Sequence, residues 1–177
     1  MKHVRDLFKT PTPVLRSPER ADGAEIWELI RACTPLDENS MYCNLLQCEH
    51  FRETCVVAEL DGKIVGWVSG YVLPDDPGTL FVWQVAVSPD ARGCGLGTLM
   101  LEHLASRNVC RDVVRLQTTI TADNAASWSL FKRFAGARGA QTRVQAYFTQ
   151  ALHFRERHKT EHMLTIELEE QVRKKVA

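Results

Sequence analysis

The sequence predicts a single α+β domain, built on a mixed, mostly antiparallel sheet that is flanked by helices. Two observations predict this class. Three β-rich segments follow one another between residues 55 and 87, and a strand–helix–strand–helix order occupies residues 80 to 135. The first two β-rich segments flank an Asp-Gly pair, which is a strong signal for a hairpin of antiparallel strands.

The first half of the domain follows from the spacing of its apolar residues. Residues 14–18 predict a short strand, and apolar residues at helical spacing predict an amphipathic helix over 20–33. Residues 39–50 predict a shorter helix with Asn39 or Ser40 as its N-cap. The hairpin and the segment after it predict strands at 55–60, 63–73 and 80–87, with a loop at 74–79.

The second half alternates between the two kinds of element. Leucines at helical spacing predict a helix over 97–108, and Asp123 or Asn124 is suited to cap a helix over 123–135. Runs rich in β-branched and aromatic residues predict strands at 113–121, 142–151 and 162–170. We expect a flexible lead-in at residues 1–13, the domain at 14–170 and a C-terminal tail at 171–177.

Composition excludes several classes of partner. The chain has 177 residues and 22 basic against 22 acidic side chains, so no net field attracts nucleic acid or an anionic membrane. Its apolar runs are shorter than the ~18 residues of a membrane helix, and its N-terminus lacks the apolar centre of a signal peptide. Six cysteines in such a chain predict reduced thiols in the cytoplasm, and the absence of any C-x-x-C pair argues against a bound metal.

A glycine-rich loop is the stretch that points most directly to chemistry. Residues 85–100 read as a strand, a loop with Gly93, Gly95 and Gly97, and a helix. Glycines let backbone N–H groups close around an anion, the start of the helix adds positive potential, and Arg92 adds a charge. A phosphate or pyrophosphate is therefore the expected ligand. No Gly-Lys-Ser/Thr follows, which excludes a nucleotide P-loop, and a glycine turn without a ligand stays an alternative.

These residues carry a resemblance to a known family. Arg92-x-x-Gly95-x-Gly97, preceded by Val85-Ala86-Val87 and Ser88-Pro89, resembles the acyl-CoA-binding motif of the GNAT superfamily of N-acetyltransferases. The resemblance implies splayed central strands, a loop that holds the CoA pyrophosphate, and backbone groups of Val85 and Val87 along the pantetheine arm. A backbone N–H at Val87 would stabilise the oxyanion of the tetrahedral intermediate. The implied residues for acetyl-CoA are Val85, Val87, Arg92, Gly93, Cys94, Gly95, Leu96, Gly97, Thr98, Asn124 and Ser127.

The last two of these belong to a second motif of the superfamily, Asn124-Ala-Ala-Ser127-Trp-Ser-Leu130-Phe131. Many members carry a tyrosine at the position of Phe131, and that tyrosine protonates the leaving thiolate. A phenyl ring cannot donate a proton. Either another group supplies the proton or the thiolate leaves without one, and Phe131 is expected to face the core.

Three separate segments narrow the resemblance. Residues 35–51, 80–87 and 154–162 resemble the diaminobutyrate acetyltransferases of ectoine biosynthesis, over about residues 14 to 169. This resemblance implies acetyl transfer from acetyl-CoA to the 4-amino group of L-2,4-diaminobutyrate, a small diamino acid. Members of this fold are often dimers, so a homodimer is expected.

The chemistry of a diamino acid suggests roles for residues in these segments. Two ammonium groups need anionic acceptors, which Asp37 and Glu161 can supply. Trp83 could hold the amine by cation–π attraction. On a helix, the spacing of His158 and Glu161 would place both side chains on one face, and either could take the proton from the amine, directly or through water. We assign ammonium binding to Asp37 and Glu161, and the role of base or substrate orienter to His158. The proposed substrate residues are Asp37, Ser40, Tyr42, Cys43, Trp83, His158 and Glu161.

Plainer interpretations remain open at this stage. Asp37 could cap a turn, Trp83 could belong to the core, His158 could be solvated, and Cys43 could be a small buried residue. No Cys-His-Asp arrangement predicts an acyl-enzyme, so direct transfer in a ternary complex is expected. An acetyltransferase for another small amine or for protein lysines and N-termini, and a non-catalytic acyl-CoA-binding module, are the alternatives.

Overall fold

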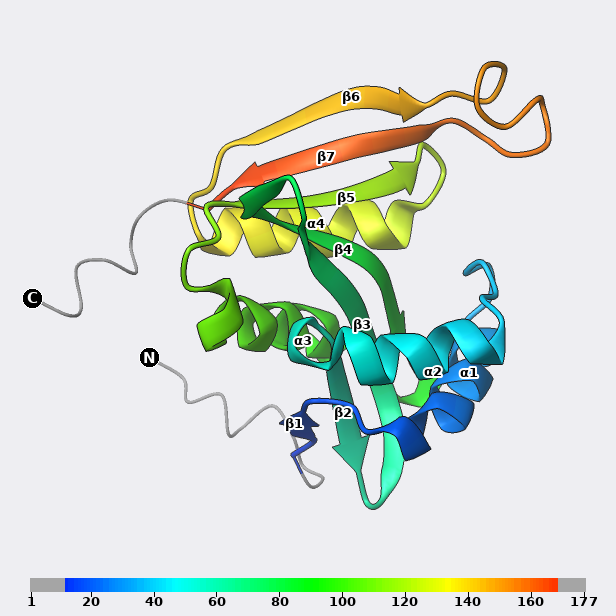
Figure 1. Ribbon diagram of the computed structural model, residues 1–177, viewed down its shortest axis with the longest axis vertical. Coiled ribbons are helices and arrows are strands. Elements are labelled where there is room, and N and C mark those ends of the chain that lie inside the picture. Colours follow the sequence, from blue (N-terminus) through cyan, green and yellow to red (C-terminus); the bar gives the residue numbers. More distant parts are fainter. Residues whose placement is uncertain (1–11, 169–177) are drawn as a thin grey trace, which may run out of the picture. The chain divides into compact units, whose positions relative to one another are not determined.

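The computed structural model of the protein describes residues 12–168. Seven strands form one mixed sheet in the order β1-β2-β3-β4-β5-β7-β6, and helices accompany them (Figure 1). This confirms the predicted fold class. Packing divides the described residues into two compact units: unit 1 holds 12–70 and 84–109, and unit 2 holds 71–83 and 110–168. Strands β3 (Lys63–Leu73) and β4 (Asp76–Val87) each have one part in unit 1 and the other part in unit 2.

Unit 1 is built on an antiparallel arrangement of β1, β2 and β3. The hairpin between β2 and β3 turns at Asp61 and Gly62, with φ of 51° and 74°. These values are those of the tight turn that an Asp-Gly pair predicts. The further elements of unit 1 are β1 (Val14–Arg16), η2 (Arg20–Asp22), α1 (Gly23–Ala32), α2 (Met41–His50), η3 (Arg52–Thr54), β2 (Val56–Leu60), η4 (Pro89–Ala91) and α3 (Leu96–Ala105).

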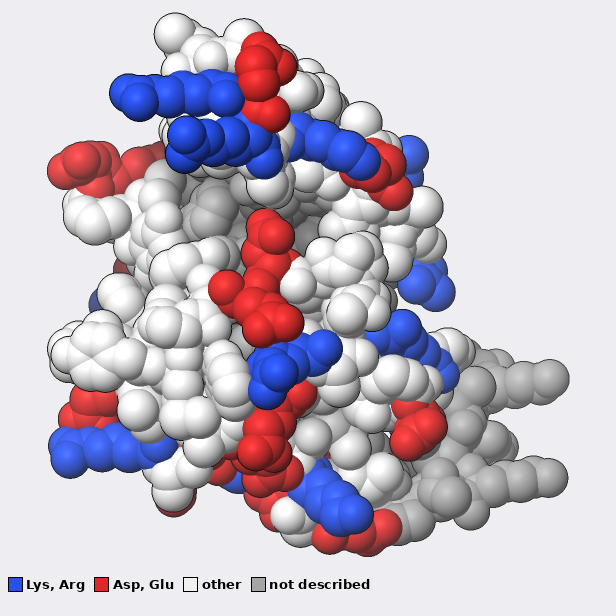
Figure 2. Space-filling model, turned by 90° about the vertical axis from the view of Figure 1, so that its right-hand side faces the viewer, with Lys and Arg blue, Asp and Glu red and all other residues white. Residues whose placement is uncertain are grey.

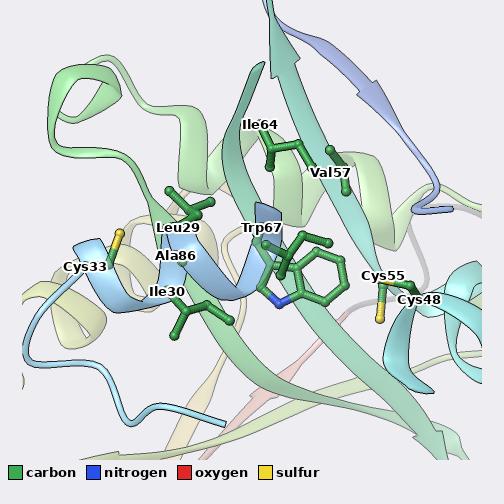
Figure 3. Close-up of a cluster of buried hydrophobic side chains, with 10 residues drawn as sticks. Leu29, Ile30, Cys33, Cys48, Cys55, Val57, Ile64, Trp67 and Ala86 are labelled. Atoms are coloured by element: carbon green, nitrogen blue, oxygen red, sulfur yellow. The ribbon is translucent and has the colours of Figure 1, made fainter. Parts of the chain in front are cut away.

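The core of unit 1 contains three of the six cysteines, Cys33, Cys48 and Cys55. Trp67 of β3 is fully buried, and it packs in one cluster with Leu29 and Ile30 of α1 and with Cys48 and Cys55 (Figure 3). Small, weakly polar thiols fill the space around the large indole, as cysteines commonly do in protein interiors. All six cysteines are free thiols, as expected.

Unit 2 combines antiparallel strands with one helix. β5 (Arg115–Thr121) pairs along its whole length with β7 (Glu161–Glu167), and β7 pairs with the edge strand β6 (Thr142–Phe148) (Figure 1). The parallel pairing of β4 with β5 covers residues 79–81. Helix α4 (Ala125–Ala137) buries Phe131, Phe134 and Ala135, and η5 (Asn108–Cys110) lies where unit 1 ends and unit 2 begins.

Several predicted boundaries differ from those observed. The predicted loop at 74–79 is a two-residue turn, because β4 already begins at Asp76 and pairs with β5 from Thr79 on. The helix predicted at 97–108 spans Leu96–Ala105, and the strand predicted at 142–151 ends at Phe148. Residues 1–11 of the predicted lead-in, residues 169–170 of the last predicted strand and the tail at 171–177 lie outside the described residues.

The surface agrees with the balanced composition. On the face drawn in Figure 2, basic and acidic side chains are interspersed and neither sign covers the face. Among residues 12–168, no helix is long and apolar enough to cross a membrane. In the same residues, no cluster of three or more His, Cys, Asp and Glu side chains is arranged to hold a metal ion.

Candidate active site

The glycine loop of unit 1 has the backbone conformation that its sequence predicts. Gly93 and Gly95 have φ of 80° and 83°, in the left-handed region that side chains with a Cβ avoid. A Cβ at either position would meet nothing within 4 Å, so the requirement for glycine is conformational and not steric. Gly97 differs from the prediction, because it lies inside the first turn of α3 and not in the loop.

Helix α3 begins without a side-chain cap. Its N-cap is Gly95, which offers no side-chain oxygen to the first amides of the helix. The first N–H groups of a helix have no partner within the helix, and they create positive potential at its start. The amides of Leu96, Gly97 and Thr98 therefore form the kind of terminus that binds phosphate oxygens.

The strand before the loop presents its backbone in a defined direction. The N–H of Ser88 donates to the carbonyl of Val65 on β3 (2.9 Å), so the polar backbone groups of Val87 point to the opposite edge of β4. The Val87 carbonyl accepts bonds from Cys33 Sγ (3.2 Å) and from Arg92 Nε (3.0 Å). The Val87 N–H points to the same edge of β4 as its carbonyl, and its oxyanion role stays a prediction.

The predicted substrate segment of unit 1 lies at the start of α2. Ser40 is the N-cap, and its hydroxyl oxygen accepts a bond from the amide of Cys43 (3.1 Å). Asp37 precedes the helix at an exposed position, and Tyr42 is 68% exposed. Cys43 is half-buried, and burial raises the pKa of its thiol. The structure thus gathers these four residues in one short segment of unit 1.

The neighbouring cysteines of α2 and the following turn are still less reactive. Burial and the charge of Asp22 raise the pKa of Cys48 to about 12, and burial raises the pKa of Cys55 to about 12. Both are thiols at neutral pH, and a thiol is a poor nucleophile.

One buried residue near Asp37 was missed by sequence reasoning. Gln84 of β4 donates from Nε2 to the backbone carbonyl of Asp37 (2.8 Å) and accepts from Asn39 Nδ2 at Oε1 (3.3 Å). Its signal in the sequence is faint. In the predicted strand 80–87, Gln84 is a polar residue on the face that also carries the apolar Val82 and Ala86.

In unit 2, helix α4 begins with a side-chain cap. Asn124 Oδ1 accepts a bond from the amide of Ser127 (3.0 Å), which confirms Asn124 as the cap. Because this bond engages Asn124 Oδ1 within its own helix, the predicted contacts of Asn124 and Ser127 with a cofactor would use Asn124 Nδ2 and the Ser127 hydroxyl. Phe131 is 3% exposed and faces the core, as expected.

His158 and Glu161 approach each other, although not through a helix. His158 lies in a bend and Glu161 is the first residue of β7, so the assumption of a helix was wrong. Nevertheless, His158 Nε2 is 3.9 Å from Glu161 Oε1. His158 Nδ1 lies 2.7 Å from the carbonyl of Lys159. A carbonyl only accepts, so the hydrogen belongs on Nδ1 and neutral His158 has its lone pair on Nε2, facing Glu161.

The segment of His158 is linked to the start of α4 by an ion pair. Lys159 Nζ contacts Asp123 Oδ2, so the residue after His158 is joined to the residue before Asn124. Trp83, also in unit 2, is 47% exposed and is not a core residue. Val82 and Ala86, on one face of β4, are buried, so Trp83 points to the opposite, exposed face of the strand.

Comparisons with known proteins identify relatives of the whole chain. Residues 23–137 match the Acetyltransferase (GNAT) family. The L-2,4-diaminobutyric acid acetyltransferase of Vibrio cholerae is 46% identical over 96% of this chain and 98% of its own length. The enzyme of the same name from Methylotuvimicrobium alcaliphilum is 47% identical over 89% of this chain and 93% of its own length.

A solved structure extends the comparison to three dimensions. It is the diaminobutyrate acetyltransferase of Paenibacillus lautus, in complex with its substrate L-2,4-diaminobutyric acid and coenzyme A. The two chains are 38% identical, the TM-score is 0.83, and the match covers 89% of this chain and 96% of the other.

Proposed function

The chain belongs to the GNAT acetyltransferase family, and we propose that it transfers the acetyl group of acetyl-CoA to the 4-amino group of L-2,4-diaminobutyrate, giving N4-acetyl-2,4-diaminobutyrate. The observation that carries this proposal is the match to a relative solved with diaminobutyric acid and coenzyme A, at 38% identity over 89% of this chain. The reaction belongs to the biosynthesis of the osmoprotectant ectoine, and we assign it to the cytoplasm.

Acetyl-CoA would be held mainly by backbone groups of unit 1. The amides at the start of α3 suit the pyrophosphate, because they carry no side-chain cap and their loop is open at Gly93 and Gly95. Val85 and Val87 of β4 would accompany the pantetheine arm. The Val87 N–H would then stabilise the negative charge that develops on the thioester oxygen during attack.

The amine would be recognised by carboxylates. Asp37 and Glu161 are proposed to accept hydrogen bonds from the two ammonium groups of the substrate, with charge-assisted bonds that are about twice as strong as neutral ones. The half-exposed ring of Trp83 can add cation–π attraction. Ser40, Tyr42 and Cys43 are proposed to complete the contact from the start of α2.

The attacking amine must lose a proton before it can form the new C–N bond. The pKa of a free alkyl ammonium lies near ~10.4, so only a small fraction is neutral at pH 7. His158 is suited to accept this proton at Nε2, because Nδ1–H is engaged by the Lys159 carbonyl and Glu161 can stabilise the resulting imidazolium. The neutral amine then attacks the thioester carbonyl directly, the C–S bond breaks, and CoA leaves as a thiolate that takes up, directly or through water, the proton lost by the new amide nitrogen.

A thiol-release assay tests the proposed function. Wild-type protein is incubated with acetyl-CoA and diaminobutyrate, ornithine, lysine or a lysine-containing peptide, and free CoA is measured. We expect the highest kcat/KM with diaminobutyrate. Turnover of the peptide alone would refute the proposed substrate, and acetyl-CoA binding without turnover of any amine would indicate a non-catalytic module.

Charge-neutralising variants test the carboxylates. Asp37→Asn and Glu161→Gln should lose most diaminobutyrate turnover while the affinity for acetyl-CoA is kept, since the bound substrate would desolvate these contacts and loss of a desolvated charged contact typically costs ~2–5 kcal/mol. Glu38→Gln and Glu167→Gln are matched controls, because their carboxylates pair with Arg31 (3.5 Å) and Arg143 (2.8 Å). Wild-type kinetics in both Asp37→Asn and Glu161→Gln would refute the proposed contacts.

We also propose that two copies of the chain associate through β6. All seven residues of this edge strand are exposed, and they include Val144 (54%), Tyr147 (44%) and Phe148 (41%). An exposed apolar edge strand offers its backbone groups and side chains to a second strand. Light scattering after size-exclusion chromatography should give twice the mass of 20.1 kDa, and Val144→Lys should lower it. A monomer at ~50 μM would contradict this expectation.

A further inference from the structure

Gln84 is a buried amide on the closed face of β4. It is 9% exposed, whereas its strand neighbours Val82 and Ala86 are each 1% exposed and share its face. Ala86 packs in the cluster that contains Trp67 and the apolar residues of α1. A side-chain amide at such a position needs partners for its polar atoms, because burial removes its hydrogen bonds to water.

The partners of Gln84 all belong to the segment before α2. Its Nε2 donates to the backbone carbonyl of Asp37 (2.8 Å), and its Oε1 accepts from Asn39 Nδ2 (3.3 Å). The backbone carbonyl of Asn39 in turn accepts from Trp27 Nε1 of α1 (3.1 Å). A buried side chain of β4, Gln84, and a half-buried side chain of α1, Trp27, thus hold the main chain of 37–39 from two different elements of unit 1.

We propose that Gln84 is a positioning residue for the acceptor amine, an inference that rests on the proposed function. Its neighbours in the chain, Val85 and then Val87, are the proposed backbone contacts of acetyl-CoA, and Gln84 holds the main chain of Asp37, a proposed contact of the ammonium. One strand therefore sets the position of the donor and of the loop that binds the acceptor. Gln84 itself contacts neither substrate.

The expected kinetic signature follows from geometry. A displacement of about 1 Å at a reacting group can lower the rate about 100-fold, even when the change lies outside the chemistry. Loss of the Gln84 bonds should move Asp37 but leave the glycine loop in place. The effect should therefore appear in kcat/KM for diaminobutyrate and not in the affinity for acetyl-CoA. Discrimination against ornithine, which is one methylene longer, should also decrease.

Gln84→Met is the main variant, because methionine has a similar shape and lacks both polar atoms. We expect a fall of about 10-fold to 100-fold in kcat/KM for diaminobutyrate, a smaller fall for ornithine, and an unchanged Kd for acetyl-CoA. Asn39→Ala removes only the bond to Oε1 and should have a smaller effect. In the double variant, the effect of Asn39→Ala should disappear, because its partner is already absent.

Thr54→Val is the control for general loss of stability. Thr54 Oγ1 donates to the buried carbonyl of Gly70 (2.7 Å), so this variant also removes a buried hydrogen bond between a side chain and the backbone in unit 1. It should lower the melting temperature without changing the preference for diaminobutyrate over ornithine.

The outcomes distinguish a failure of the positioning role of Gln84 from a failure of the proposed function. If Gln84→Met only lowers the melting temperature, as Thr54→Val does, and keeps wild-type kinetics and amine preference, the positioning role is refuted. If Gln84→Met and Asn39→Ala act additively, the proposed coupling through their hydrogen bond is refuted. If the wild-type protein turns over no diaminobutyrate at all, the proposed function fails and this inference fails with it.

Discussion

Helices α3 and α4 begin in opposite ways, although both N-termini are proposed to bind acetyl-CoA. Helix α3 in unit 1 starts at Gly95, with no side-chain cap and with a left-handed residue at the cap position. Helix α4 in unit 2 starts at Asn124, whose side-chain oxygen accepts a bond from the amide of Ser127. One helix leaves its first amides without a side-chain cap, and the other satisfies one of them with its own side chain.

The difference indicates two modes of recognition. An uncapped terminus recognises an anion through backbone N–H groups, and almost any side chain can occupy the positions around it provided that the backbone conformation is kept. A capped terminus is stable by itself and contacts a ligand through the remaining atoms of its side chains. Substitutions at α3 should therefore act through conformation, and substitutions at α4 should act through side-chain chemistry.

Gly95→Ala should have the largest effect. A Cβ at this position meets no atom within 4 Å, but φ is 83°, and a left-handed conformation costs a non-glycine residue about 1–2 kcal/mol. We expect KM for acetyl-CoA to rise about 10-fold, which follows from ~1.4 kcal/mol per factor of ten. Initial-rate kinetics at saturating diaminobutyrate measure this.

Gly136→Ala is the matched control for that substitution. Gly136 lies in α4, its Cβ would also meet nothing within 4 Å, and its φ is not in the left-handed region. Alanine should leave KM unchanged and stabilise the helix by about 0.5–1 kcal/mol, measured by denaturant unfolding. Equal kinetics of the two alanine variants would contradict the conformational role of Gly95.

Asn124→Ala and Asn124→Ser should separate the cap of α4 from its contact with the cofactor. Alanine removes the acceptor for the Ser127 amide and should lower the free energy of unfolding by about 1 kcal/mol, whereas serine keeps a capping oxygen. Both should raise KM for acetyl-CoA about 2-fold to 10-fold, because both remove the Nδ2 donor. If serine restored KM together with stability, the cap alone would explain the effect.

Arg92→Gln should have a smaller effect that depends on salt. Arg92 is exposed, and its Nε donates to the Val87 carbonyl (3.0 Å), which leaves the terminal guanidinium nitrogens to face a phosphate. An exposed ion pair is worth about 0.2–1 kcal/mol, so KM for acetyl-CoA should rise less than about fivefold. The difference should shrink as salt is added. Arg111→Gln, beside Asp112 on the surface (3.2 Å), should show no such change.

Phe131→Tyr should have the smallest effect on catalysis. Phe131 is 3% exposed and faces the core, so a new hydroxyl should lower stability and leave kcat unchanged. A general acid typically contributes ~10²–10⁴-fold to a rate. A large increase in kcat would therefore show that a hydroxyl at this position of α4 reaches the leaving thiolate.

Local signals in the sequence predicted much of the candidate site. The sequence predicted Asn39 or Ser40 and Asp123 or Asn124 as caps, and Ser40 and Asn124 are the caps observed. The Asp-Gly hairpin also lies where the sequence predicted it, because caps and turns depend on residues within a few positions of one another. The approach of His158 to Glu161 was predicted from a helix that does not exist. A bend before β7 produces it instead, and such a bend has no periodic signal.

Other features depend on residues that are far apart in the chain. Gln84 and Asp37 are 47 positions apart, so nothing near either residue predicts the bond between them. The start of β4 at Asp76 was likewise missed, because Pro77 and Gly78 indicate a loop, whereas the strand runs through both residues before it pairs with β5 from Thr79 on. The sequence also left open whether Trp83 is buried or exposed, because hydrophobicity alone does not distinguish an exposed tryptophan from a buried one.

The sequence by itself determined the fold class and the family, because these reside in contiguous motifs whose glycines, caps and turns act through local backbone conformation. Only the tertiary structure decided which buried side chain holds the main chain of Asp37, which nitrogen of His158 lies against the Lys159 carbonyl, and which face of β4 stays open at Trp83. Such features arise when packing brings distant residues together and every buried polar group must find a partner.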